Sequence, residues 1–476
     1  MKKVISLLII LLSLNLAACG GNSEASQKTE SETSDSKLSE SPDSNSSELT
    51  DSKPSDEPEV SDEKLGEFNK NCTLDETVMV DEDGVKITAT GLNYNDYSAE
   101  LELTIENNSG KDLSFVCGSM AHSCNSVNGY MVNDGYMNCD VANGKKANEK
   151  ISFSYEGLML YGINEIADIE IDFSMADDDY NRVYSGPRQV KTSAFDAHDY
   201  SKNCYRDTIT SQAAMNTYDY DIACFSQDVL YDVNGVKLLS SGIMINKDGE
   251  TALLLELENT TNDTVYVSTS DIAINDLIVK SSTWSSNAIN PGKHCIIILE
   301  TSSVLDAEYQ SIYGVKDIGT VSLSLSQQNS DGNDIADKTS IEVVVPGVNA
   351  EFDSTGEEVY NKNGLRILSK TVFEDPSENS SDMYVFLLAE NKSGKTLSID
   401  DVHDSLSVNG FMTDYFFYSK ELSDGKYAVL EIKLKESSLE DNKISNASEV
   451  KEVDVGFKIK EYGNTIDEPS LKISFN

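Results

Sequence analysis

The sequence predicts an all-β protein, and two patterns support the prediction. The first is alternation: Leu101, Leu103 and Ile105 are apolar and the residues between them are polar, which gives a strand one apolar face. The second is the frequency of turn signals, such as Asn-Asn-Ser-Gly at 107–110, which separate runs of this kind along most of the chain. Together they indicate about seven short strands per unit, the pattern of an immunoglobulin-like β-sandwich.

The strand-turn-strand stretch at 101–115 returns at 253–267 and at 385–399, and later landmarks recur in the same order. Such a long spacing is typical of whole domains, because solenoid repeats are about 20 to 50 residues long. We therefore expect three tandem sandwich domains. The chain divides into a signal peptide (1–18), a tether (19–65), a first module (66–193), a connector (194–222), a second module (223–346) and a third module (347–476).

The first 18 residues have the features of an export signal. Lys2 and Lys3 precede a short apolar run, and Leu-Ala-Ala-Cys closes the segment at Cys19. This pattern describes a secretory signal rather than a membrane span. Leu-Ala-Ala-Cys resembles the lipobox of bacterial lipoproteins, and the resemblance implies cleavage before Cys19 and a diacylglycerol on its sulfur that anchors the protein in the membrane. The alternative is an ordinary signal peptide in which Cys19 is incidental.

Acidic and small polar residues dominate the tether and extend through the chain. The segment 19–65 contains almost no large apolar side chain, so it cannot offset its chain entropy and we expect an acidic, Ser-rich, disordered tether. The whole chain has 82 Asp and Glu against 37 Lys and Arg, a net charge of −45. A charge of this sign repels phosphates, so we expect no nucleic-acid partner.

Three marks recur in the modules: an Asn/Asp-Gly-Val-Lys strand opener, a Glu-Asn-x-Ser/Thr turn and a Val-Asn-Gly-Tyr/Phe segment. With these marks, most of 75–476 resembles the immunoglobulin-like modules of uncharacterised Firmicutes lipoproteins. The resemblance implies a sandwich fold on the outer face of the cell membrane, and none of the marks is a catalytic motif. The second module departs at Asn262 and Asp276, where its siblings have glycine, but Asn and Asp tolerate positive φ well.

Seven cysteines follow Cys19, an odd number that excludes complete internal pairing. Since an exported location permits disulfides, five of them are possible disulfide residues: Cys117, Cys124, Cys139, Cys204 and Cys224. The last two bracket the connector. The first three could also form a metal cluster with His122, but their spacing fits no recognised zinc pattern. Buried thiols are the other interpretation, and we expect no metal site and no cofactor.

The densest aromatic run, at 411–418, contains the candidate ligand contacts Tyr415, Phe416, Phe417 and Tyr418. Because neighbours on a strand point to opposite faces, one set of rings can pack in the core while the other lies at the surface. Exposed clustered rings suit a protein or glycan ligand. A shared packing role is the alternative, since Tyr136 and Trp284 stand at the corresponding places of the other modules.

No nucleophile elbow and no paired Cys/His arrangement is present, and carboxylate pairs arise by chance among so many acidic residues. We therefore do not expect an enzyme. The sequence favours a lipid-anchored cell-surface lipoprotein that binds or adheres, without catalysis, to a protein or wall glycan at the cell envelope. The alternative is a structural spacer or envelope accessory protein without a specific ligand.

Overall fold

The structure is a computed structural model that describes residues 63–118, 124–278, 285–301, 306–375 and 382–475. The expected signal peptide, the proposed lipidation site Cys19 and almost all of the tether lie outside these residues. From Lys64 onward the chain forms one compact unit. None of the helices described is both long enough and apolar enough to cross a membrane.

Strands make up 54% of the described residues and lie in several sheets, with only five short α-helices in the same ranges, so the all-β prediction is confirmed. The first module contains β1 (Thr77–Glu82), β2 (Val85–Tyr94), β3 (Ser98–Asn107), β4 (Leu113–Cys117), β5 (Asn125–Val127), β6 (Tyr130–Val132), β7 (Met137–Val141), β8 (Lys145–Ser154), α2 (Tyr155–Leu160), β9 (Asp168–Ala176) and β10 (Arg182–Lys191). The connector contains η2 (Phe195–Ala197), α3 (Cys204–Ile209), α4 (Gln212–Tyr218) and the start of β11 (Tyr220–Ser226).

The second module continues with β12 (Asp232–Val233), β13 (Val236–Asn246), β14 (Thr251–Asn259), β15 (Val265–Ile274), β16 (Leu277–Ile278), β17 (Ser285–Ile289), β18 (His294–Glu300), α5 (Ala307–Tyr313), β19 (Thr320–Gln328) and β20 (Asp334–Val344). The third module contains β21 (Glu357–Lys362), β22 (Leu365–Glu374), β23 (Met383–Asn391), β24 (Leu397–Asp401), β25 (Ser407–Val408), β26 (Phe411–Met412), β27 (Tyr415–Phe417), β28 (Lys420–Leu422), β29 (Tyr427–Leu434), α6 (Glu436–Asp441), η4 (Ala447–Glu449), β30 (Glu452–Glu461), β31 (Asn464–Asp467) and β32 (Ser470–Ser474).

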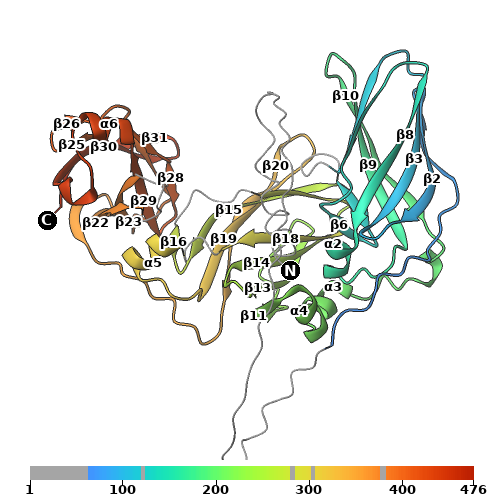
Figure 1. Ribbon diagram of the computed structural model, residues 1–476, viewed down its shortest axis with the longest axis horizontal. Helices are drawn as coiled ribbons and strands as arrows, with labels where there is room; N and C mark the ends of the chain where they lie inside the picture. Colours follow the sequence, from blue (N-terminus) through green and yellow to red (C-terminus); the bar gives the residue numbers. More distant parts are fainter. Residues whose placement is uncertain (1–62, 119–123, 279–284, 302–305, 376–381, 476) are drawn as a thin grey trace, which may run out of the picture. The chain divides into compact units, whose positions relative to one another are not determined.

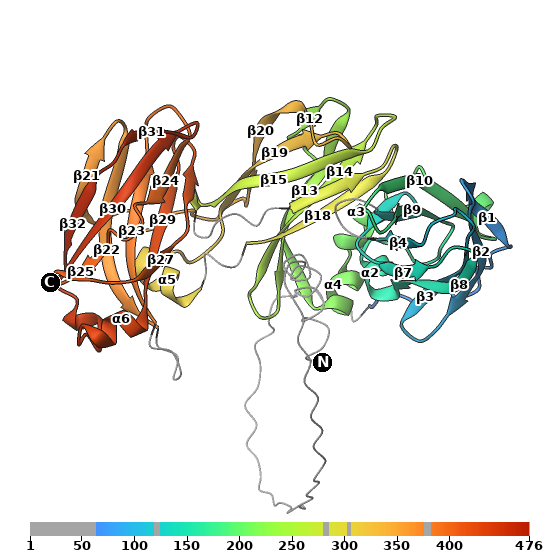
Figure 2. The same ribbon diagram turned by 90° about the horizontal axis from the view of Figure 1, so that it is seen from above.

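Each module contributes strands to two sheets, labelled in Figure 1. The first sheet of the first module is β1-β2-β3-β8, and its second sheet continues into the second module in the order β11-β13-β14-β18-β6-β5-β9-β4-β7. The second module joins the third in the order β20-β19-β15-β16-β29-β23-β22-β21, and the last sheet runs β26-β25-β30-β24-β28. Figure 2 shows β22, β23 and β29 side by side. Successive modules therefore meet through one short parallel pair each, β6 with β18 and β16 with β29.

The alternating apolar residues form the cores. On β3, Leu101, Leu103 and Ile105 are each at most 1% exposed, while the residues between them are partly exposed. In the third module, Val385 on β23 and Phe457 on β30 belong to one buried cluster although their strands lie in different sheets. Two sheets that enclose one core form a sandwich, which is why each strand needs only one apolar face.

Three buried asparagines, Asn107, Asn259 and Asn391, repeat one hydrogen-bonded turn in the three modules. Each is 0% exposed at the end of its strand. Each side-chain amide donates to two backbone carbonyls at 2.6 to 2.9 Å, and each Oδ1 accepts the N–H of the residue two positions later at 2.9 to 3.0 Å. A buried amide whose donors and acceptor are all used fixes the turn firmly. The Glu-Asn-x-Ser/Thr mark is therefore a structural turn.

A second set, Asn128, Asn275 and Asn409, begins the turn that precedes β6, β16 and β26. All three have positive φ, between 49° and 52°. Each Oδ1 accepts two consecutive backbone N–H groups at 2.7 to 3.2 Å, and each amide donates to a carbonyl at 2.7 or 2.8 Å. These bonds fix the hairpin tip in the same way in each module, so the strand that follows starts from the same place.

The connector is more ordered than its composition indicates. Asn203 caps α3 by accepting the N–H of Arg206 at 2.9 Å, and Ser211 caps α4 in the same manner. Tyr205 and Ile209 on α3 are each 1% exposed. Helices of six or seven residues are marginal alone, so packing of these side chains stabilises them.

Candidate binding surfaces

The aromatic run of the third module lies on β27 and the turn after it, and its rings alternate between core and surface. Tyr415 and Phe417 pack against the buried cluster of the third module, with the Phe417 ring 5.4 Å from that of Phe457. The Tyr415 hydroxyl donates to Asp401 Oδ2 at 2.8 Å. Burial and this hydrogen bond raise the pKa of Tyr415 to about 12. Tyr415 and Phe417 therefore anchor the strand.

The two other candidate residues face outward. Phe416 is 54% exposed and Tyr418 is 73% exposed. β27 pairs with β29 in register, with Phe416 opposite Lys433, and turning Phe416 inward would require a shift that exposes Tyr415 and Phe417. Tyr136, at the corresponding place of the first module, is 61% exposed and so does not pack as Phe417 does. Trp284 lies outside the described residues.

The seven cysteines that the structure describes are all thiols, so none of the possible disulfides is formed. For Cys117 and Cys139 the reason is register: β4 and β7 set Cys117 opposite Met137 and Cys139 opposite Phe115. Diagonal neighbours are about 7 to 8 Å apart, which is beyond the usual span of a disulfide. Cys204 begins α3, whereas Cys224 lies on β11 next to Ile243.

Burial raises the pKa of the Cys117 thiol to about 12 and that of the Cys124 and Cys139 thiols to about 11. Such thiols are poor nucleophiles and poor metal ligands at neutral pH. No group of three His, Cys, Asp or Glu side chains able to hold a metal ion occurs in the described ranges, and His122 lies outside them.

A buried carboxylate that the sequence did not single out lies where the connector meets the second module. Glu256 on β14 is 0% exposed. Ser240 donates to it at 2.7 Å, His294 Nδ1 lies at 3.0 Å, and Arg206 Nε from α3 lies at 3.3 Å. Asn203 also donates to it. Burial favours the neutral acid, but hydrogen bonds from His294, Ser240 and Asn203 outweigh it and hold the pKa of Glu256 below its ordinary value.

The Glu256 network has a structural role, because every bond ties the connector or a neighbouring strand to β14. A signal was present in the sequence: Glu256 interrupts the otherwise apolar run Leu253 to Leu257, and a charge inside a central strand is rarely buried without partners. The partners themselves come from positions 203, 206, 240 and 294, and spacing alone does not bring these together.

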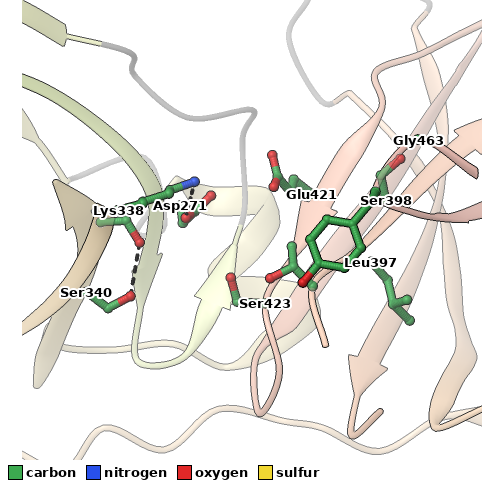
Figure 3. A pocket seen from close by; sticks show the side chains of 11 residues that line it. Asp271, Lys338, Ser340, Leu397, Ser398, Glu421, Ser423 and Gly463 are labelled. Carbon is green, nitrogen blue, oxygen red and sulfur yellow. Dashed lines mark hydrogen bonds and ion pairs between the residues drawn. The ribbon is translucent and has the colours of Figure 1, made fainter. Parts of the chain in front are cut away.

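Figure 3 shows a polar cleft of about 490 Å³ between strands of the second and third modules. Asp271 and Lys338 form an ion pair of 2.7 Å on one side, and Glu421 projects from the other. Hydroxyl groups supply much of the remaining lining, including that of Ser340. Ligand clefts are usually lined by apolar side chains with a few polar groups, so this cleft is a weaker candidate than the surface of Phe416 and Tyr418.

No protein-family model and no curated protein matches the sequence. Solved structures that the chain resembles include a bacterial ice-binding adhesin studied for host cell surface retention (9% identity, 79% of this chain and 90% of that chain, TM-score 0.14). They also include the exo-chitosanase of Amycolatopsis orientalis (6% identity, 84% of this chain and 78% of that chain, TM-score 0.16). A third is red sea bream transglutaminase (12% identity, 57% of this chain and 31% of that chain, TM-score 0.13). TM-scores this low support no argument about function.

Proposed function

We propose that the protein is a lipid-anchored binding or adhesion protein of the cell envelope, acts without catalysis, and uses Phe416 and Tyr418 to contact a protein or glycan. The observation that carries the proposal is the alternation on β27. Tyr415 and Phe417 fix the strand from inside, and the rings between and after them are left at the surface. A structural spacer would instead be expected to have uniformly polar surfaces on its modules, without exposed aromatic rings.

The chemistry of these side chains favours recognition. Aromatic rings offer large contact areas at low entropy cost, and they are enriched among residues that dominate binding energy. Because the core holds β27 in place, the Phe416 ring is preorganised and loses little conformational entropy on binding. The net charge of −45 disfavours anionic polymers, so the expected ligand is a neutral glycan or a neutral to basic protein surface.

Attachment to the membrane is the second part of the proposal and rests on Leu-Ala-Ala-Cys at Cys19. A thioether-linked diacylglycerol together with a further acyl chain would anchor the polypeptide stably, whereas a single acyl chain gives only marginal membrane binding. Replacing Cys19→Ser is expected to abolish incorporation of labelled palmitate and to release the protein from the membrane fraction. Retention of the label in the variant would contradict the assignment.

Binding is tested with the full chain and isolated envelope material, separated into wall glycan and surface protein. The double variant Phe416→Ser/Tyr418→Ser is expected to bind at least about tenfold more weakly, since two central aromatic contacts are lost. Tyr462→Ser is the matched control, because Tyr462 is 84% exposed on the same module. Equal binding by all three proteins would exclude these rings as the contact. Absence of saturable binding by the unmodified protein would favour the spacer.

A further inference from the structure

The two junctions between modules use the same backbone contact. In the first module, Gly129 follows Asn128, and its carbonyl accepts the N–H of His294 at 2.9 Å, which starts the parallel pairing of β6 with β18. In the second module, the Asp276 carbonyl accepts the N–H of Tyr427 at 2.9 Å, which starts the pairing of β16 with β29. The hairpin tip of each module thus docks on the first residue of a strand in the next.

The docking strands also add apolar side chains to the core that follows. Met131 and Ile278 stand three positions after Asn128 and Asn275, and each is 5% exposed. Met131 packs in the buried cluster of the second module and Ile278 in that of the third. Tyr130 and Leu277, one position earlier, are 4% and 1% exposed.

The receiving strands share a Gly-Lys-x start. Gly292 and Gly425 donate to Asn259 and Asn391 at 2.8 Å, and the residue after each glycine is a lysine. Lys293 pairs with Glu170 of the first module, and Lys426 pairs with Asp276 of the second. Each junction therefore combines a backbone hydrogen bond, an apolar insertion and an ion pair from the receiving lysine.

The third module carries a docking strand whose side chains are exposed, and Asn442 donates to the Met412 carbonyl at 3.2 Å. β26 follows Asn409 and Gly410 as β6 follows Asn128 and Gly129, and it pairs with β25 among the described strands. Phe411 is 56% exposed and Met412 is 63% exposed, whereas the four equivalent side chains at the other junctions are 1 to 5% exposed.

The first module carries a receiving strand at the edge of its sheet. β8 ends the order β1-β2-β3-β8, and it begins with the same elements: Gly144 donates to Asn107 at 2.6 Å, and Lys145 and Lys146 follow. Lys146 lies opposite Glu106, just as His294 lies opposite Glu258 and Tyr427 opposite Glu390. By this register the Lys146 N–H points away from β3, toward the open edge.

We propose that β26 of one copy docks on β8 of a second copy of this chain, and so repeats the internal junction between molecules. The Gly410 carbonyl would accept the N–H of Lys146, and Phe411 and Met412 would be covered. Lys145 would pair with Asp454, which lies opposite Ser407 as Glu170 lies opposite Ser126. Donor and receiver are different surfaces, so the contact is head-to-tail and extends into chains or rings rather than closing as a twofold dimer.

The contact is small and is expected to be weak in dilute solution. Copies held on one membrane have a much higher effective concentration, which makes a weak contact sufficient there. The proposal does not rest on the ligand proposed above, because Phe416 and Tyr418 take no part in it. Either idea can fail alone.

Photo-crosslinking of the full chain tests the geometry. Phe411→p-benzoylphenylalanine, in a mixture of isotopically labelled and unlabelled copies on vesicles, is expected to give mixed-isotope crosslinks to the peptide containing Lys145 to Lys150. Tyr462→p-benzoylphenylalanine is the matched control, since Tyr462 is 84% exposed on the same module. Crosslinks confined to one copy, to other peptides or to another protein would overturn the proposal.

Association itself is measured by sedimentation of the full chain in mild detergent. Phe411→Asp/Met412→Asp and Lys146→Pro are each expected to weaken it at least tenfold, the second by removing one N–H on an edge strand, where proline is tolerated. Ser152→Pro is the control. The Ser152 N–H also points away from β3, but Ser152 lies beyond the two positions that would pair if the contact has the length of the β16–β29 pairing. Circular dichroism confirms that each variant is folded. Equal association of all the proteins, or no association of the unmodified chain at high protein concentration in the detergent, would overturn the proposal.

Discussion

The two junctions between modules share a parallel strand pairing, but aromatic side chains pack beside one pairing and a buried carboxylate with polar partners lies beside the other. At the second junction, α5 sets Tyr309 and Tyr313 against Phe386, with ring centroids 5.9 and 6.4 Å apart. Leu388, three residues before Asn391, is 0% exposed in the same cluster. At the first junction the position three residues before the corresponding asparagine is Glu256, which is surrounded by polar groups of the connector and β18.

The difference shows that the same strand pairing can be filled by apolar side chains or by a network of charged and polar groups. Apolar packing depends on volume and is insensitive to pH, whereas a buried carboxylate needs all of its partners and its ionised form. The packing of α5 against Phe386 at the second junction should therefore tolerate acid and be disrupted by a buried charge. The first junction should tolerate neither acid nor the loss of a partner.

The largest effect is expected from transferring the charge of the first junction to the second. Leu388→Glu would bury a carboxylate without the arginine, asparagine and histidine that surround Glu256, and the expected loss is about 4 kcal/mol or more of the free energy of unfolding. Urea unfolding, with hydrogen exchange followed on peptides from β23 and α5, measures it. Val344→Glu is the control, since Val344 is 54% exposed. A loss of unfolding free energy below about 1 kcal/mol would show that water reaches the Leu388 side chain at this junction.

The converse substitution, Glu256→Leu, should cost about 3 kcal/mol, because the buried Ser240 and the partly buried Arg206 and Asn203 lose their acceptor. Adding Arg206→Met is expected to recover part of the loss. Hydrogen exchange on β14 and α3 localises both effects. Glu357→Leu, at an exposed site, is the control. A neutral result for Glu256→Leu alone would mean that the network contributes no stability to the first junction.

The same pair of proteins gives a pH test. The folded-state pKa of Glu256 is below its ordinary value of 4.5, so its contribution is complete above pH 4.5 and is lost as the pH falls through the folded-state pKa. The stability difference between the unmodified protein and Glu256→Leu should shrink in that range. A difference that stays constant down to pH 3 would contradict the assignment.

Much of the scaffold was predictable because local rules and the fold agree. Alternation placed Leu101, Leu103 and Ile105 on a buried face, and it predicted that the rings of the 411–418 run would divide between core and surface. Which rings face outward was not predictable, because both faces of that run are aromatic and only the pairing of β27 with β29 decides it. Whether Phe416 and Tyr418 bind a ligand stays a prediction.

The junctions were not predictable from local patterns. Helices α3 and α4 are too short to form without tertiary contacts, so the connector read as a linker. The partners of Glu256 are separated by up to about ninety positions in sequence, and no spacing rule joins them. The placement of the cysteines was not predictable for a related reason: strand register separates Cys117 from Cys139 by one diagonal step, which composition does not show.

The smallest effect that we predict is a stabilisation, and it concerns Asp172, a residue of β9 near the first junction. Burial raises the pKa of the second module's Tyr266, and the charge of Asp172 on β9 adds to that shift. The pKa of Asp172 itself is raised to about 6, mainly by burial. Its Oδ1 atom makes no hydrogen bond within the described structure. A raised acid pKa means that the folded state binds the proton more tightly, so stability falls as the pH rises from 3.8 to 6.

Asp172→Asn should therefore stabilise the protein at pH 7 by about 1 to 2 kcal/mol, which is less than the full shift implies because the site is partly exposed. The gain should shrink as the pH falls from 6 to 4 and vanish well below pH 3.8, where the carboxyl is neutral in both states. Asp178→Asn, at an exposed position of the same module, should change little. Urea unfolding at pH 7 and pH 4 distinguishes the outcomes. Destabilisation at both pH values would mean that Asp172 makes stabilising contacts at the first junction, as Glu170 and Glu256 do.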